Sequence, residues 1–199
     1  MNTDTINKNK YGISEWSNYS LNFWNIPKCG ATAVKAALFK KEITDPYAIH
    51  AEYHSTDSQK FISINDALSN GYLNFAVVRN PYDRAISMYK DFGLRRPIKK
   101  HKNQNLRDFD YFLDNVILRS KDETCNSHFR SMSSYIQPDG KLLVDKVFNF
   151  SNVGNFLKEY NLIFSPLNVT PHIDIKLTKE QKEKIHYRYK NDFSLIEYL

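Results

Sequence analysis

Two segments of this chain share one construction: an apolar run, a polar turn and the beginning of a helical pattern. The first covers residues 23–32 (FWNIPKCGAT), and the second, about fifty residues further on, covers residues 75–87 (FAVVRNPYDRAIS). Each segment predicts a strand that enters a helix, with a cation and a hydroxyl side chain near the junction. Backbone N–H groups at the start of a helix bind anions. The pair therefore suits a ligand that has two separate anionic groups.

Apolar runs and helical periodicity alternate along the rest of the chain. Strands are predicted at 21–26, at 73–78 and within 142–150, and helices at 31–40, 63–69, 80–93, 106–117, 151–160, 178–190 and from 192. The run at 73–78 is nearly all apolar, as in a strand covered on both faces. This alternation predicts an α/β fold, a three-layer α/β/α domain with a mainly parallel central sheet. We expect a polar N-terminal lead-in over residues 1–18 and a single domain over residues 19–199.

Bulk composition narrows the class of protein without choosing a function. The 199 residues suffice for one domain, and the net charge of +6 favours anionic partners in general. The two cysteines, Cys29 and Cys125, lie far apart and suggest no disulfide framework. Residues 1–10 are polar, and the chain holds no run of about 18 apolar residues. We therefore expect a soluble protein of a reducing compartment, the cytoplasm, without a membrane span.

The first turn has the parts of a phosphate cradle. Lys28 supplies a point charge, Gly30 lets a ligand approach the backbone, and Thr32 supplies a hydroxyl donor at the helix start. The nucleoside-triphosphate loop places its lysine directly after the last glycine, whereas here the lysine precedes it. A phosphatase-like role for Cys29 lacks an arginine in the turn, so we interpret Cys29 as a loop residue. By itself the turn is better interpreted as an ordinary strand-to-helix connection.

The second turn joins an arginine to a serine eight residues later. Arg79 ends the predicted strand, at the edge of the sheet where open α/β folds bind ligands. Ser87 lies two turns into the next helix, and together the two side chains suit a phosphate group. The alternative is that Arg79 pairs with Asp83 and that Ser87 is merely buried. Taken alone, the second turn leaves both interpretations open.

Taken together, the two turns resemble the sulfotransferase superfamily, in its carbohydrate-type branch, which uses 3′-phosphoadenosine 5′-phosphosulfate (PAPS). Residues 26–32 resemble the 5′-phosphosulfate loop of that family, and residues 79–89 resemble its 3′-phosphate motif. Residues 126–129 (NSHF) resemble a His-aromatic segment of the branch, with Phe129 in place of the usual tryptophan, and the tail from Ile185 to Leu199 resembles the closing pattern. The resemblance implies a P-loop-like sulfotransferase fold. It also implies a PAPS site, whose cofactor-binding residues would be Lys28, Cys29, Gly30, Ala31, Thr32, Ala33, Arg79 and Ser87.

The resemblance implies transfer of a sulfuryl group to a hydroxyl or amine of an acceptor, expected to be a carbohydrate. Lys28 would stabilise charge on the leaving nucleotide, and a histidine would accept the acceptor's proton. His54, between the two motifs, is the first candidate for this base and His128 is the second. Ala33 stands where family loops often carry a second hydroxyl, and the membrane anchor of many Golgi members is missing from the sequence.

The same sequence gives weaker support for other partners and functions. His50 and His54 are four apart, but the segment has poor helical character and no third ligand, so we expect no metal. The basic run between Arg95 and Lys102 is interpreted as a solvated loop, and no nucleic acid is expected. The alternatives are a nucleotide or small-molecule kinase on a similar fold, which the missing Gly-Lys-Ser/Thr element disfavours, and a non-catalytic nucleotide-binding module.

Overall fold

The computed structural model describes residues 12–40, 60–95, 105–165 and 174–197. The chain forms two compact units. The first, which we name the sheet unit, comprises Met1–Val78 and Met132–Leu167 with Leu199; the second, the helical unit, comprises Arg79–Ser131 and Asn168–Tyr198. The single domain expected over residues 19–199 stays a prediction.

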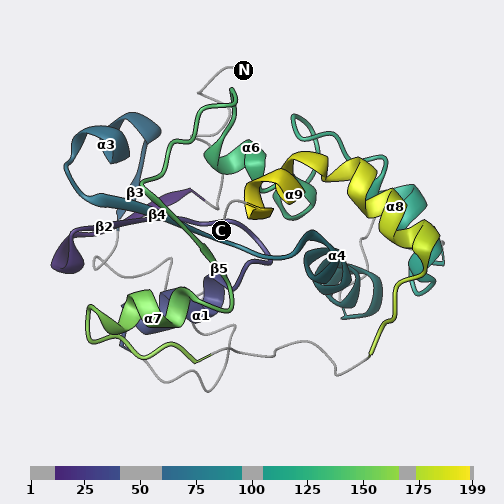
Figure 1. Cartoon of the computed structure of the whole chain (residues 1–199), viewed down its shortest axis with the longest axis horizontal. Coiled ribbons are helices and arrows are strands. Elements are labelled where there is room, and N and C mark those ends of the chain that lie inside the picture. The colour runs from purple at the N-terminus through teal and green to yellow at the C-terminus, as the bar shows by residue number, and fades with distance from the viewer. Residues whose placement is uncertain (1–11, 41–59, 96–104, 166–173, 198–199) are drawn as a thin grey trace. The chain divides into compact units, whose positions relative to one another are not determined.

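The sheet unit is built on a five-stranded sheet (Figure 1). The strands are β1 (Ile13–Trp16), β2 (Leu21–Trp24), β3 (Lys60–Ile62), β4 (Leu73–Val78) and β5 (Lys146–Asn149), in the order β3-β1-β2-β4-β5. β2 pairs with β4 and β4 with β5 in parallel, whereas β1 is antiparallel to both β2 and β3. The mainly parallel sheet predicted from the sequence is therefore confirmed, and β4 has the predicted bounds.

Strand β1 lies inside the segment that we expected to be a polar lead-in. Ile13 and Trp16 are buried, and the Trp16 indole N–H donates to Ser14 Oγ at 2.9 Å. A four-residue strand with two apolar side chains is too short for a period-2 pattern to stand out. The lead-in expected over residues 1–18 is thus interrupted by a core strand at 13–16.

Helices α1 (Ala31–Leu38) and α7 (Val153–Lys158) cover one face of this sheet (Figure 1). Val34 of α1 and Phe156 of α7 belong to the same buried cluster as Phe23 and Phe75 from adjacent strands. The Phe23 and Phe75 rings stack at 5.0 Å, and the Phe75 and Phe156 rings lie 5.1 Å apart. Aromatic side chains from the strands and α7 thus form much of the core of this unit, on the side of the sheet where the first turn leads into α1.

Helix α3 (Ile64–Ser69) lies against the opposite face, where the strands carry asparagines. The carboxamides of Asn22 and Asn74 both donate to the Ala67 carbonyl, at 3.2 and 3.0 Å. The Trp24 indole also donates to Asn74 Oδ1, at 2.9 Å. Buried polar groups need such partners. The layers α1/α7, sheet and α3 are the three-layer α/β/α arrangement that the sequence predicts.

The helical unit has its own core. Its elements are α4 (Pro81–Tyr89), η3 (Lys90–Arg95), α5 (Phe109–Phe112), η5 (Leu113–Ile117), η6 (Ser127–Phe129), α8 (Lys179–Arg188) and α9 (Lys190–Glu197). Met88, Phe112 and Ile185 are fully buried within one cluster. Thr178 and Gln181 form the predicted capping box at the start of α8.

Two predicted helix ends differ from the structure. Gly93 was expected to end the helix after the second turn, but α4 continues into the π-helical η3 through Arg95. An added Cβ at Gly93 would lie 2.6 Å from Tyr89 and 2.8 Å from the Leu106 carbonyl, so this glycine permits close packing and is not a stop. The helix expected to be capped by Ser151 begins instead at Val153, after Asn152, and ends at Lys158 as α7.

Candidate functional site

The first turn connects β2 to α1 and has two residues in the left-handed region. Lys28 has φ = 67° and Gly30 has φ = 81°. Gly30 is the N-cap of α1, and no side chain caps the helix there. Lys28, Gly30, Ala31 and Thr32 are partly exposed. A cation and a hydroxyl therefore lie at a helix N-terminus that solvent reaches, as an anion site requires.

A ring of the sheet unit packs directly on Gly30. A Cβ built at this glycine would lie 2.3 Å from Cε2 and 2.4 Å from Cδ2 of Phe150, which follows the end of β5. From the sequence, Gly30 is expected to let a ligand approach the backbone closely. The structure adds a second reason, since both φ and the Phe150 ring require a residue without a side chain.

Cys29 and Ala33 face away from solvent. Cys29 is 1% exposed, and its Sγ lies 3.4 Å from Sδ of Met132, which is buried as well. Ala33 is 3% exposed. This environment agrees with Cys29 as a loop residue and gives its thiol no route to a substrate. At both positions only the backbone is placed to take part in the turn.

Asn25, three residues before Lys28, is a polar residue that the sequence analysis passed over. It is 2% exposed, and neither Nδ2 nor Oδ1 has a hydrogen-bond partner in the part of the chain that the structure describes. An unpartnered buried amide costs about 1–3 kcal/mol. The available signal was an asparagine near the end of the strand predicted over residues 21–26, in which the other residues apart from Asn22 are apolar.

Lys35, one turn into α1, is a second group that the sequence analysis did not single out. It is 2% exposed, and burial lowers the pKa of its amine to about 7. At neutral pH Lys35 therefore carries less charge than a surface lysine does, so the partly exposed Lys28 is the better placed cation of the turn.

The second turn begins the helical unit. Asn80 caps α4 by accepting the Tyr82 N–H at 2.9 Å, and Pro81 is its first residue, as predicted. Arg79, immediately before this cap, is partly exposed. Asp83 makes no ion pair with any residue in the described ranges, so the alternative pairing of Arg79 with Asp83 is not seen.

Ser87 lies on the buried side of α4. It is 9% exposed, and its hydroxyl makes no hydrogen bond within the described ranges. A serine that serves only the core normally bonds its hydroxyl. Because Ser87 Oγ is not among the fully buried polar atoms that lack a partner, solvent can reach it, and both interpretations of this serine stay open.

Arg84, three residues before Ser87, is 1% exposed and contacts both the His128 segment and the C-terminal part of the helical unit. Its Nη2 donates to the His128 carbonyl at 3.3 Å, its Nη1 lies 3.9 Å from Asp192 Oδ2, and its guanidinium lies 5.7 Å from the centre of the Tyr189 ring. Residues three apart are neighbours on a helix. The backbone of His128 therefore lies beside the face of α4 that carries Ser87.

His128 stands in the short helix η6 and is partly exposed. Asn126 Oδ1 accepts the His128 backbone N–H at 3.0 Å and lies 2.8 Å from its Nδ1. The ring meets Phe92 edge-on at 4.9 Å. The side chain is thus oriented by two neighbours, as a general base should be.

Phe129 occupies the position where the resembling segment has tryptophan. It is 4% exposed and contacts the Phe92 and Phe112 rings. Its carbonyl accepts hydrogen bonds from the Tyr189 hydroxyl at 3.0 Å and from Arg188 at 3.2 Å. Phe129 therefore packs in the core of the helical unit and fixes the backbone next to His128.

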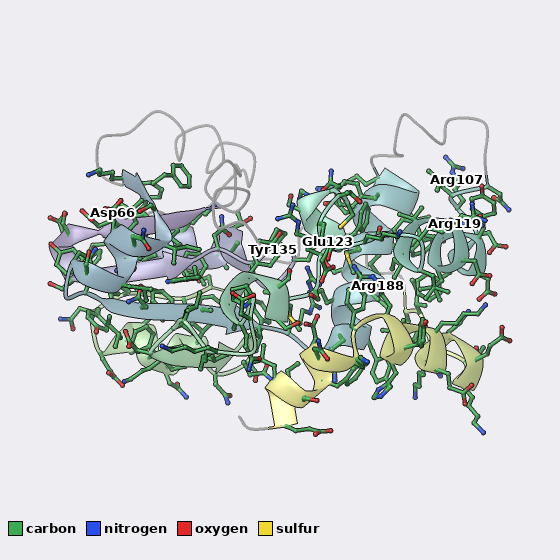
Figure 2. The ribbon with its side chains drawn as sticks, turned by 90° about the horizontal axis from the view of Figure 1, so that it is seen from above. Asp66, Arg107, Arg119, Glu123, Tyr135 and Arg188 are labelled. Atoms are coloured by element: carbon green, nitrogen blue, oxygen red, sulfur yellow. The ribbon has the colours of Figure 1, made fainter. Side chains whose placement is uncertain are left out.

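A half-buried carboxylate fixes the other end of this segment. Asp122 accepts hydrogen bonds from the Ser131 backbone and hydroxyl and from Arg188 of α8. Figure 2 shows Arg188 rising from α8 toward the segment of Glu123, the neighbour of Asp122. Burial alone would raise the pKa of Asp122, but the Ser131 hydroxyl and Arg188 outweigh it, so the pKa lies below its ordinary value.

The remaining predictions fall outside these two turns. His54 and its neighbour His50 lie outside the described residues. Among the residues that are described, no three His, Cys, Asp or Glu side chains form a group that could hold a metal ion. Every helix within the described ranges is too short or too polar to cross a bilayer.

Comparison with known families gives one match. The model described as the sulfotransferase family matches residues 16–150, about two thirds of the chain, including both turns and the His128 segment. Comparisons with curated proteins and with solved structures found no match. With its mainly parallel α/β sheet and its two strand-to-helix turns, the chain belongs to the sulfotransferase family.

Proposed function

We propose that the protein transfers a sulfuryl group from PAPS to a hydroxyl or amine of a carbohydrate acceptor. The observation that carries the proposal is the first turn. There the partly exposed Lys28 and Thr32 lie at the uncapped N-terminus of α1, in a chain of the sulfotransferase family. Aligned backbone amides and a cation at one helix start favour bound anions.

The two turns would bind different phosphate groups of the PAPS donor. Lys28 and the first amides of α1 would stabilise the negative charge that grows on the 5′-phosphate as its bond to sulfur breaks. Arg79 and Ser87 would bind the 3′-phosphate, the arginine through its planar fork and the serine through its open hydroxyl. The acceptor's proton would pass to a histidine, either His54, the first candidate from the sequence, or His128.

Calorimetry with adenosine 3′,5′-bisphosphate and with ATP tests the donor. We expect the bisphosphate to bind and ATP not to bind. Arg79→Ala should weaken bisphosphate binding, while Arg107→Ala, at an exposed position labelled in Figure 2, should leave it unchanged. Binding of ATP without the bisphosphate would refute the proposal in favour of a kinase.

Turnover with labelled PAPS tests the chemistry. Lys28→Met should lower kcat by about a hundred- to thousandfold, the usual cost of one lost donor at a developing charge. Lys141→Met, at an exposed turn of the same unit, is the matched control. If the bisphosphate binds but no glycan or small metabolite becomes labelled, the second candidate gains. That candidate is a non-catalytic nucleotide-binding module, and the buried Ala33, which brings no hydroxyl to the loop, favours it.

A further inference from the structure

One side-chain oxygen beside His128 makes two contacts that together determine the state of the ring. Asn126 Oδ1 lies 3.0 Å from the His128 backbone nitrogen and 2.8 Å from its Nδ1. A backbone N–H can only donate, so the carboxamide atom facing it is the oxygen and not the NH2 group. The same oxygen can only accept from Nδ1, which must therefore carry the proton.

This contact fixes the tautomer of the neutral imidazole. With the proton on Nδ1, the lone pair resides on Nε2. The amide of Asn126 is uncharged, so it orients the ring without the strong rise in basicity that a carboxylate would bring.

The backbone that carries the ring is held from two helices. The carbonyl of His128 accepts from Arg84 of α4, and the carbonyl of Phe129 accepts from Arg188 and Tyr189 at the end of α8. The ring itself packs against Phe92. These contacts leave the imidazole little freedom to rotate away from Asn126.

We propose that Asn126 is a positioning residue that holds His128 in its Nδ1–H tautomer, with Nε2 as the general base of sulfuryl transfer. The inference rests on the proposed function. The acceptor O–H bond breaks and its proton forms a bond to Nε2. The oxygen's freed electron pair forms the new bond to sulfur, and the bond from sulfur to the 5′-phosphate breaks with its pair on the phosphate oxygen. Asn126 stays bonded to Nδ1–H throughout.

Three variants separate orientation from helix capping. Asn126→Ser keeps an oxygen that can cap η6 but is too short to reach Nδ1. Asn126→Asp keeps both contacts and adds a charge, which raises the pKa of the imidazole. Asn115→Ser is the matched control, since Asn115 is an amide of the same unit whose side chain donates to the Tyr111 carbonyl at 3.1 Å.

Nitrogen NMR of the His128 ring and pH–rate profiles of the full-length protein are the measurements. The wild type should show the Nδ1–H form, and Asn126→Ser should shift to Nε2–H. Its kcat should fall about tenfold or more while bisphosphate affinity is kept, and His128→Ala should lose about a hundredfold or more. Asn126→Asp should keep the tautomer and move the acid limb of the profile to higher pH.

Two results would overturn the inference alone: an Nε2–H tautomer in the wild type, or full kcat in Asn126→Ser or His128→Ala. A wild type that binds no bisphosphate and transfers no sulfuryl group would refute the proposed function and the role of the base together. The NMR spectrum would still confirm or contradict the Asn126 contact in that case.

Discussion

The hydroxyl of Tyr189 donates a 3.0 Å hydrogen bond to the carbonyl oxygen of Phe129, 60 residues earlier in the chain. The same Tyr189 ring lies over Arg84 of the second turn, and Phe193 packs on Tyr82 at 4.8 Å. The C-terminal pattern that resembles the family thus packs onto the second motif and the histidine segment. Its contribution is to support the backbone of the segment that carries His128.

Tyr189→Phe tests this support. The change removes one hydrogen bond and keeps the buried ring, so the free energy of unfolding should fall by about 1 kcal/mol. Arg188 still donates to the Phe129 carbonyl, which limits the loss. Tyr187→Phe, whose tyrosine is 81% exposed, should change stability by less than about 0.5 kcal/mol. Equal effects of the two changes in urea unfolding would contradict the structural role.

Gly30→Ala should destabilise the sheet unit by about 2–5 kcal/mol. A left-handed φ costs an L-residue about 1–2 kcal/mol, and overpacking against Phe150 adds about 1–3 kcal/mol. Gly140→Ala is the matched control, since Gly140 has φ = 78° but no atom within 4 Å of its built Cβ. The Gly140→Ala variant should lose only the stability that a left-handed φ costs, about 1–2 kcal/mol. A loss at Gly30 no larger than that at Gly140 would mean that the Phe150 ring yields.

Local chemistry explains how much of this fold was predictable. The apolar run of β4, the Asn80-Pro81 start of α4 and the Thr178–Gln181 capping box depend on neighbours in sequence, and the structure has all three. The turn residues at Lys28 and Arg79 were recognisable for the same reason.

Features that depend on distant partners escaped prediction. Arg84 looks like a surface residue in sequence, yet it is buried because Asp192 and the Tyr189 ring meet it from the end of the chain. Strand β1 is defined by its pairing with β2 and β3 more than by its own pattern. The orientation of His128 required the contact with Asn126, which residue spacing alone does not reveal.

Asn25→Leu should stabilise the protein, in contrast to most core substitutions. The side chain is buried and its two polar atoms lack partners within the described residues, so an apolar group of similar shape removes a cost of about 1–3 kcal/mol. Asn22→Leu, three residues earlier in β2, is the control, because the Asn22 carboxamide makes four hydrogen bonds of 2.9–3.2 Å. It should lose stability. Thermal unfolding of both variants tests this prediction. If Asn25→Leu is destabilised, the Asn25 amide has a hydrogen-bond partner.

The Asp122 carboxylate should make stability depend on acid pH. Its pKa is lowered in the folded protein, so its contribution is complete above the unfolded value of about 4 and is lost as the pH falls through the folded pKa. Asp122→Asn should therefore cost about 2–3 kcal/mol at pH 7, where it leaves Arg188 without its charged partner. The difference between the two proteins should narrow as the pH falls below about 4 and close below the lowered folded pKa, where the wild-type carboxyl is neutral as well. Chemical unfolding at pH 7, 4 and 3 measures the difference in the free energy of unfolding between the two proteins. A difference that does not shrink toward pH 3 would contradict a stabilising ion pair between Asp122 and Arg188.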